Sequence, residues 1–262
     1  MRHVLVTGSA GGIGAAIAAR FAADGARLTL SDYRADELSA TADALRTEHG
    51  VEVAELPGDL ADASFAEGLV DRAGRLDVLV NAAGIYPATP LLEMTAQAWD
   101  RVQDVNVRAA LLTTVAFGRQ GGSGSVVNIS SGAATRARPG AAHYATSKAA
   151  LEMLTKACAV ELGAHGIRVN AVSPGFVTVD SPANPVTEAY AAAVSVNPLG
   201  RRGLPVDIAE AVYWLAGEHA AWITGAVLRV DGGSTAGAPS LPLHWDGETA
   251  VQQGSLEGQL HA

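Results

Sequence analysis

Residues 4–14 read VLVTGSAGGIG, so a short apolar run passes directly into a glycine-rich turn. The run Val4–Thr7 has the length and side-chain types of a buried strand, and an alanine-rich stretch with helical spacing follows it. Glycines at such a turn let the backbone bend tightly and approach a pyrophosphate, which free N–H groups and the helix dipole attract. The stretch therefore predicts a strand-turn-helix unit that binds a dinucleotide, and a tight glycine turn without a ligand is the alternative.

Strand-like and helix-like stretches continue to alternate up to residue 233, which is typical of parallel strands joined by crossover helices. The strand-like runs are apolar throughout, so both faces of the sheet are expected to be buried. We expect strands at Val4–Thr7, Arg27–Ser31, Glu52–Leu56, Leu76–Asn81, Ser125–Ser130, Arg168–Val172 and Val227–Val230. We expect helices at Gly12–Asp24, Asp36–His49, Ala63–Ala73, Ala96–Phe117, His143–Ala164 and Pro205–Gly217. The sequence thus predicts an α/β protein, a doubly wound parallel sheet of about seven strands with a Rossmann fold, in a single domain at residues 1–233.

The last segment, residues 234–262, lacks this alternation. Gly, Pro, Ser and Gln mix there with isolated apolar residues such as Leu241, Leu243 and Trp245. We expect a C-terminal tail that is either disordered or lies across the pocket of a neighbouring subunit.

Composition excludes several classes of function. The chain of 262 residues carries a net charge of −9, which disfavours binding to nucleic acid or to an anionic membrane surface. The single cysteine, Cys158, excludes an intrachain disulfide and a thiolate zinc cluster, and it fits a cytoplasmic protein. No secretory signal and no apolar run of the ~18 residues that span a membrane is found, and the histidines show no metal-binding spacing.

Asp32 lies at the end of the second expected strand, 18 residues after Gly14. A carboxylate at this position can accept hydrogen bonds from the adenosine ribose and would repel the 2′-phosphate of NADP, so NAD is favoured as cofactor. Arg34 could weaken that preference by offering a cation to a phosphate, or it could be an ordinary exposed arginine.

Tyr144 and Lys148 are four residues apart in an expected helix, so both side chains lie on one face. A nearby ammonium favours the phenolate form, which makes the pair a candidate acid-base catalyst, although such pairs are also common on helix surfaces. Ser130 and Ser131 follow the fifth expected strand, where a doubly wound sheet presents ligand-binding groups. A serine hydroxyl there could hold a substrate oxygen beside the phenol, or the two serines could simply form a turn.

Taken together, these motifs resemble the short-chain dehydrogenase/reductase family, in its short single-domain subgroup. The resemblance runs in order from about residue 3 to 233 and is carried by Thr7-Gly8-x-x-x-Gly12-Ile13-Gly14, Asn81-Ala82-Ala83-Gly84, Ser131, Tyr144-x-x-x-Lys148, Pro174-Gly175 and Val230-Asp231-Gly232-Gly233.

The resemblance implies a role for each matching residue. Tyr144 would be the general acid/base, Lys148 would lower its pKa and bind the nicotinamide ribose, and Ser131 would anchor the substrate oxygen. Asn106 would complete the catalytic set by supporting a proton-relay water. The residues implied in cofactor binding, besides Tyr144 and Lys148, are Gly8, Ser9, Gly12, Ile13, Gly14, Asp32, Asp59, Leu60, Asn81, Ala82, Gly84, Pro174, Gly175 and Val177.

The chain departs from the family pattern at two positions. Ala83 stands where many members have a second asparagine, which removes a side-chain amide but leaves the backbone contacts. Val179 stands where a threonine is often found, and Thr178 precedes it, which puts side-chain recognition of the nicotinamide carboxamide in doubt.

The expected reaction is reversible hydride transfer between a secondary alcohol and its ketone, with NAD as cofactor and NADP as the less favoured one. An NADPH-dependent 3-oxoacyl or carbonyl reductase is the alternative within the family, and a non-catalytic dinucleotide-sensing regulator is the alternative from another class. A serine hydrolase is excluded because no Gly-x-Ser-x-Gly elbow occurs.

The substrate pocket is expected to include the loop at 180–200, with Tyr86 and Phe176 as apolar walls. Arg136 and Arg138 either reach a substrate carboxylate or are solvated loop arginines. The two long helices carry surplus apolar residues, Ala149, Leu154, Ala157 and Ala159 among them, which predicts a homo-oligomer, as dimers and tetramers are common in the family.

Overall fold

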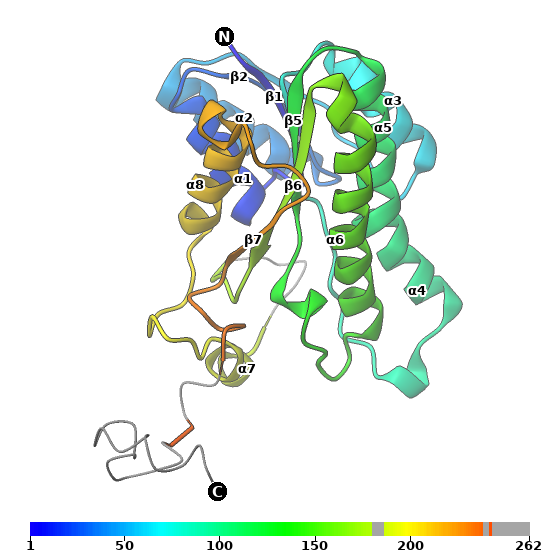
Figure 1. Cartoon of the computed structure of the whole chain (residues 1–262), viewed down its shortest axis with the longest axis vertical. Coiled ribbons are helices and arrows are strands. Elements are labelled where there is room, and N and C mark those ends of the chain that lie inside the picture. The colour runs from blue at the N-terminus through cyan, green and yellow to red at the C-terminus, as the bar shows by residue number, and fades with distance from the viewer. Residues whose placement is uncertain (180–185, 238–240, 243–262) are drawn as a thin grey trace, which may run out of the picture.

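A parallel sheet forms the centre of the protein (Figure 1), seen here in a computed structural model that describes residues 1–179, 186–237 and 241–242. Seven strands are found in these residues, in the order β3-β2-β1-β4-β5-β6-β7, and every pair is parallel. The order reverses between β1 and β4, which is the switch point where doubly wound sheets bind their ligands. The strands are β1 His3–Thr7, β2 Arg27–Ser31, β3 Val53–Glu55, β4 Val78–Asn81, β5 Gly124–Ile129, β6 Ile167–Pro174 and β7 Val227–Val230.

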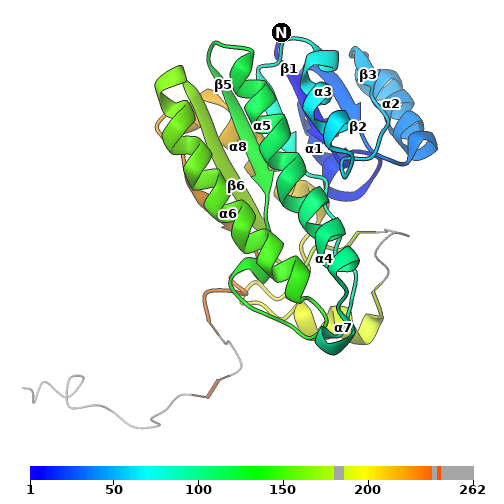
Figure 2. The same cartoon turned by 90° about the vertical axis from the view of Figure 1, so that its right-hand side faces the viewer.

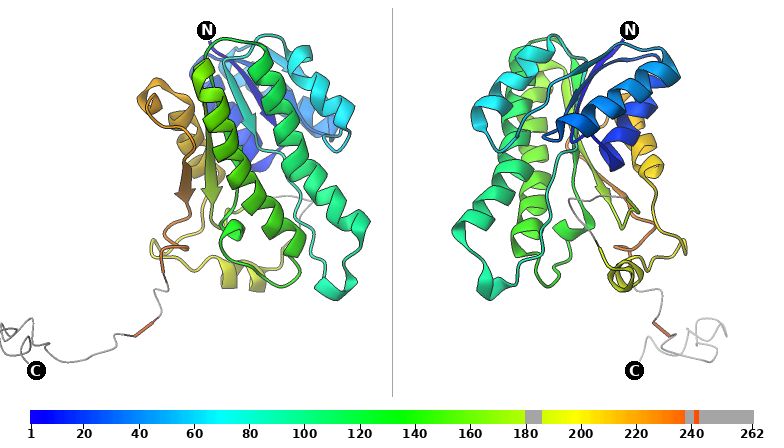
Figure 3. Two further views of the ribbon diagram at one scale, coloured as in Figure 1. Left: turned by 45° about the vertical axis from the view of Figure 1, so that its right-hand side comes forward. Right: turned by 180° about the vertical axis from the view of Figure 1, so that it is seen from behind.

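Helices cover both faces of the sheet (Figure 3). The two hydrophobic cores show which helix covers which face: α1, α2 and α8 pack on one side, and α3, α5 and α6 on the other. The helices are α1 Gly12–Ala22, α2 Ala35–His49, α3 Ala63–Ala73, α4 Ala96–Gln103, α5 Ala109–Arg119, α6 Ala142–Leu162, α7 Glu188–Val194 and α8 Pro205–Ala216. The single-domain, doubly wound Rossmann fold predicted from the sequence is therefore confirmed.

Two elements differ from the prediction. The stretch Ala96–Phe117, expected as one helix, consists of α4 and α5 joined by a π-helical turn at Asp104–Arg108. Such a turn adds a residue to the helix and is frequent at functional sites. A short helix, α7, lies within the expected substrate loop and below the carboxyl ends of the strands (Figure 2). Residues 180–185 of that loop, and 238–240 and 243–262 of the expected tail, lie outside the described residues.

In the described part of the chain, no helix combines the length and the apolar character that a membrane span requires.

The glycine-rich turn between β1 and α1 packs tightly against the end of β4. Gly8 has a φ of +67°, and a Cβ built there would lie 2.6 Å from the Cα of Ala83. Thr7 fixes the same contact, because its Oγ1 accepts the N–H groups of Ala82 and Ala83 at 3.1 and 3.2 Å. Only glycine therefore fits at residue 8 without moving the end of β4.

The substitution Gly8→Ala is expected to lower the free energy of unfolding by about 2–4 kcal/mol, because it adds a strained φ and a backbone clash. Gly11→Ala is the matched control: its φ of 175° is extended, and the nearest neighbour of its Cβ is Arg34 Nη2 at 3.9 Å. We expect Gly11→Ala to change stability by less than about 0.5 kcal/mol. Urea unfolding followed by circular dichroism checks both, and equal losses in the two variants would contradict this account.

Candidate active site

A cavity of about 450 Å³ opens at the carboxyl ends of β4, β5 and β6, between the sheet and α7. Ser131, Tyr144 and Lys148 all line it, so the structure brings these three predicted catalytic residues together. They come from different places: Ser131 follows β5, while Tyr144 and Lys148 lie in α6. The spacing in α6 was visible in the sequence, but the approach of Ser131 depends on the packing of α6 against β6 and against the short 3-10 helix Gly132–Ala134, which Ser131 caps.

Tyr144 forms a hydrogen bond with the side chain of Ser131. Burial raises the pKa of the Tyr144 phenol above its ordinary value, while the bond from Ser131 and the charge of Arg138 act in the opposite direction. Ser130 turns elsewhere, since its Oγ donates to Glu152 Oε1 at 2.8 Å. Of the two serines considered from the sequence, Ser131 is therefore the one that holds the phenol.

Lys148 is 4% exposed, and its Nζ donates to the carbonyl oxygen of Ile129 at 2.8 Å. Burial lowers the pKa of this ammonium to about 8. Its Nζ lies 5.8 Å from the centroid of the Tyr144 ring. Ser131 and Arg138 act to lower the pKa of Tyr144. The corresponding effect of Lys148 stays a prediction.

Asn106 lies in the π-helical turn and is 1% exposed. Its Oδ1 accepts the N–H of Ile85 at 2.9 Å, and its Nδ2 donates to Ile85 O and to Ser147 Oγ, both at 3.0 Å. Asn106 therefore lies behind the cavity and holds the segment after β4. It converges with Lys148 at Gly84, where an added Cβ would lie 3.3 Å from Lys148 Nζ and 3.5 Å from Asn106 Oδ1.

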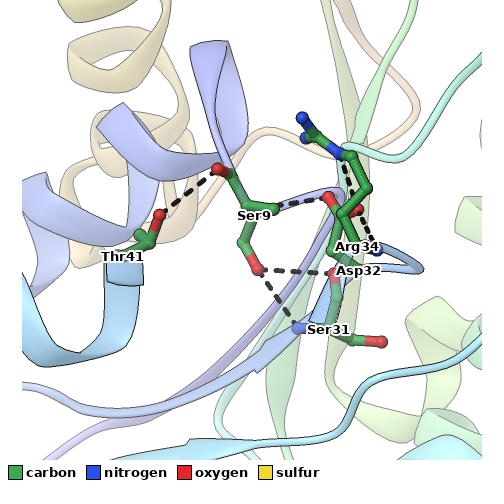
Figure 4. Close-up of polar contacts among 6 residues, drawn as sticks. Ser9, Ser31, Asp32, Arg34 and Thr41 are labelled. Atoms are coloured by element: carbon green, nitrogen blue, oxygen red, sulfur yellow. Dashed lines mark hydrogen bonds and ion pairs between the residues drawn. The ribbon is translucent and has the colours of Figure 1, made fainter. Parts of the chain in front are cut away.

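The adenosine end of the expected cofactor site is built around Asp32 (Figure 4). Asp32 is 6% exposed; its Oδ2 accepts the N–H of Ala10 at 3.1 Å, and its Oδ1 accepts the backbone N–H and the Nε of Arg34 at 3.1 and 3.3 Å. Ser9 bonds through its Oγ to the backbone of Ser31, so its side chain ties the turn to β2. These bonds hold the glycine turn rigidly beside the end of β2.

The residues of this turn fit a dinucleotide. The first N–H groups of a helix have no acceptor within the helix, and here they belong to α1, which begins at Gly12. Gly14 cannot carry a side chain, because its Cβ would lie 2.1 Å from Gly8 O. Ile13 lines the cavity. A pyrophosphate placed against this turn would meet unpaired donors and the positive end of the helix dipole.

Asp59 and Leu60 have different environments. Asp59 pairs with Arg101 Nη1 at 2.9 Å and accepts the N–H of Ala61 at 2.9 Å, whereas Leu60 is buried in the second core. Burial acts to raise the pKa of Asp59, but the bonds from Arg101 and Ala61 outweigh it and lower that pKa. Gly58 donates its N–H to Asp32 O at 3.0 Å, which places the whole segment beside Asp32.

The segment after β4 contributes backbone atoms, more than side chains, to the candidate active site. Asn81 points into the protein: its Nδ2 donates to Asn128 Oδ1 at 2.9 Å, and its Oδ1 accepts from Thr113 Oγ1 at 2.8 Å. Ala82 and Gly84 line the cavity. Ala83, the first departure from the family pattern, packs against the second core, and its N–H still reaches Thr7.

Pro174, Gly175 and Val177 line the opposite side of the cavity. Gly175 packs against Asp231, whose Cα would lie 2.8 Å from a Cβ at residue 175. Thr178 and Val179, where the chain departs from the family pattern, also line the cavity. The sequence pointed to the loop at 180–200 as a whole but did not single out the individual wall residues. They are Val186, Tyr190, Ala191 and Val194 within that loop, and Arg202 and Ser234 beyond it. A helix-capping signal was available for α7, since Thr187 precedes an alanine-rich stretch and its Oγ1 accepts the N–H of Tyr190 at 3.2 Å.

Ser234 lines the cavity and binds Asp231 Oδ2 at 3.3 Å, so the described chain remains attached to the domain just beyond residue 233. Among the described residues, no group of three or more His, Cys, Asp or Glu side chains could hold a metal ion.

Comparisons with known proteins agree with this geometry. A family model described as enoyl-(acyl carrier protein) reductase matches residues 8–235. The chain is 37% identical over 242 residues to cyclopentanol dehydrogenase from Comamonas testosteroni, covering 89% of this chain and 96% of that protein. It is 35% identical over 232 residues to the 3-oxoacyl-(acyl-carrier-protein) reductase FabG of Rickettsia felis, covering 87% and 95%. A crystal structure of a short chain dehydrogenase from Burkholderia cenocepacia in complex with NADP is similar with a TM-score of 0.84 and 36% identity, covering 89% of this chain and 98% of that one.

The buried ammonium of Lys148 predicts a pH-dependent stability. Its pKa is about 8 in the folded protein and 10.5 ordinarily, so the unfolded chain binds more protons between these values and wild-type stability rises with pH across that window. Below pH 8 the Lys148 ammonium is charged in the folded protein, so the free-energy cost of burying that charge is fully present. Lys148→Met removes the charge, and we expect it to stabilise the cofactor-free protein at pH 7 by about 1–3 kcal/mol, after allowing for the lost bond to Ile129.

Urea unfolding at pH 7 and pH 9.5 measures this difference, which is expected to shrink at the higher pH. Lys156→Met, at an exposed position of the same helix, is the control and is expected to show no such pH-dependent gain. A gain from Lys148→Met that stays constant with pH would contradict the assignment.

Proposed function

The chain belongs to the short-chain dehydrogenase/reductase family and is an NAD(P)-dependent oxidoreductase, and we propose that it transfers hydride reversibly between a secondary alcohol and its ketone. The observation that carries this proposal is the contact of the Tyr144 phenol with Ser131 in a cavity that Lys148 also lines. The glycine turn of α1 opens toward the same cavity through Ile13. One continuous site can therefore hold a dinucleotide and a small substrate together.

Tyr144 is the proton-transfer group in this proposal. In ketone reduction the phenol donates its proton to the carbonyl oxygen, and in alcohol oxidation the phenolate accepts the hydroxyl proton. Ser131 donates a hydrogen bond to the substrate oxygen and keeps it beside the phenol. The dinucleotide, when bound, supplies or accepts the hydride.

Lys148 and Asn106 support this proton transfer. The ammonium of Lys148, with a pKa near 8, can change its proton within the physiological range and can bind ribose hydroxyls of a cofactor placed along Gly84. Asn106 positions Ile85 and, through Ser147, the backbone of Tyr144. A proton-relay water beside these groups remains part of the proposal.

A 3-oxoacyl or carbonyl reductase is the second candidate, and the similarity to FabG of Rickettsia felis favours it. It uses the same proton chemistry at Tyr144 and differs only in the substrate. A non-catalytic dinucleotide sensor is disfavoured, because binding alone requires neither the buried phenol nor its bond to Ser131.

We propose NAD as the preferred cofactor. Asp32 presents a buried carboxylate at the end of β2, and its negative charge would lie close to a 2′-phosphate. The Arg34 side chain is already bound to Asp32 through Nε at 3.3 Å, so much of its charge is offset by that partner. The similar Burkholderia cenocepacia protein was crystallised with NADP, which makes the comparison of the two cofactors the decisive measurement.

We also propose that the chain forms a homo-oligomer through α5 and α6. Exposed apolar side chains on these helices include Leu111, Met153 and Val160. Of the apolar residues named from the sequence, Ala149 and Ala157 are exposed, Leu154 is half-buried, and Ala159 belongs to the core, where it packs near Gly225. The cytoplasmic location and the domain boundary at residue 233 stay predictions.

Tyr144→Phe is expected to lower kcat for any alcohol or ketone substrate by at least about 1000-fold, because the proton donor is lost while the ring remains. NADH binding, followed by its fluorescence, is expected to stay within about threefold of wild type. Tyr213→Phe is the control: Tyr213 lies in α8, away from the cavity, and its hydroxyl bonds Arg2. NADH binding with no turnover of any alcohol or ketone by the wild type would favour the sensor.

Asp32→Asn keeps the shape of the side chain and removes its charge. We expect wild type to bind NADH more tightly than NADPH, and the variant to shift the ratio of the two dissociation constants toward NADPH by about tenfold or more. Fluorescence titration with each reduced cofactor gives both constants. Tighter binding of NADPH by the wild type would overturn the role proposed for Asp32.

A further inference from the structure

The cavity beside Tyr144 is positively charged, although the whole chain carries a net charge of −9. Its lining residues include the cations Arg136, Arg138, Lys148 and Arg202, and the single described acidic residue among them is Glu188. Glu188 is already paired with Arg202. A concentration of cations in a cavity of an acidic protein raises the local concentration of anionic ligands.

Arg138 lies beside the proposed chemistry. Its guanidinium carbon lies 5.7 Å from the centroid of the Tyr144 ring and 5.2 Å from that of Tyr190 in α7. The side chain thus bridges the catalytic helix and the helix that closes the cavity. Arg136, by contrast, is exposed at the rim.

Within the described part of the chain, the guanidinium of Arg138 keeps free hydrogen-bonding capacity. Its Nε is buried without a hydrogen-bond partner, and no carboxylate of the described residues pairs with its guanidinium. A guanidinium has five N–H donors in a planar fork that matches a carboxylate. The two tyrosine faces attract the cation but accept few of these N–H groups, so an anion in the cavity would complete the site.

We propose that the substrate carries a carboxylate and that Arg138 binds it beside the Tyr144 phenol. This inference rests on the proposed hydride transfer at Tyr144. The guanidinium packs near the ring of the acid/base residue, so a carboxylate bound to Arg138 lies close to the carbon that reacts at Tyr144. A short molecule therefore carries both groups. The substrate class is therefore a short oxo acid and the corresponding hydroxy acid. The apolar residues Val186 and Val194 and the ring of Phe176 then contact its carbon chain.

The test compares acids with their methyl esters, which have the same chain but no charge. 3-Oxobutanoate, 4-oxopentanoate and 5-oxohexanoate, and the three esters, are titrated by calorimetry into protein saturated with the oxidised cofactor, so that no hydride can be transferred. We expect the best acid to bind at least tenfold more tightly than its ester. Turnover of the same six ketones with the reduced cofactor is expected to show the same preference in kcat/KM.

Arg138→Gln is expected to reduce the acid-to-ester ratio, in binding and in kcat/KM, at least tenfold, and Arg138→Lys to have an intermediate effect. Arg119→Gln, at an exposed position near the end of α5, is the matched control and is expected to keep the wild-type ratio. If Arg138 only supported the tyrosine rings, its replacement would lower the affinity and the kcat/KM for acid and ester equally.

The outcomes separate the two proposals. Acid binding that depends on Arg138, without turnover of any ketone, contradicts the proposed hydride transfer and supports the carboxylate site. Two results overturn the carboxylate site. The first is turnover without a preference for acids. The second is equal affinity for acid and ester at every chain length, which includes the case in which neither binds. An equal loss for acid and ester in Arg138→Gln overturns it as well.

Discussion

The contact between the turn after β1 and the end of β4 is the constraint on which the rest of the site depends. Gly8 approaches Ala83 so closely that no side chain fits between them, and Thr7 binds two N–H groups of the same segment. β1 and β4 flank the point where the strand order reverses. This contact therefore aligns the phosphate-binding turn with the cavity that contains Ser131 and Tyr144, and a dinucleotide can span both.

Burial shapes the chemistry at the other end of the site. It raises the pKa of Tyr144 and lowers that of Lys148, so both changes oppose the charged forms of these groups. The phenol is left with Ser131 and Arg138 as the groups that favour its ionised form. A bound dinucleotide and an anionic substrate would alter the same balance, which couples occupation of the site to the proton affinity of Tyr144.

Much of the fold could be predicted because its signals are local. Apolar runs, alanine-rich helices and the glycine turn specify the strands and most helices, since hydrophobic period and turn chemistry involve neighbouring residues. The π-helical turn at Asp104–Arg108 could not be predicted, because tertiary contacts of Asn106 with Ile85 and Ser147 hold it in place. The helix α7 is only seven residues long, and so short a helix depends on packing more than on propensity.

The sequence by itself determined the residue types of the site, including Tyr144, Lys148, Ser131 and Asp32, because motif spacing along strands and helices places them at one edge of a parallel sheet. Only the tertiary structure decided which partners these side chains have. It turned Asn81 into the interior, bound Asp32 to Ala10 and Arg34, and packed Arg138 between Tyr144 and Tyr190. The physical reason is that a side chain's charge environment depends on residues distant in sequence, which become neighbours only when the helices and loops pack against the sheet.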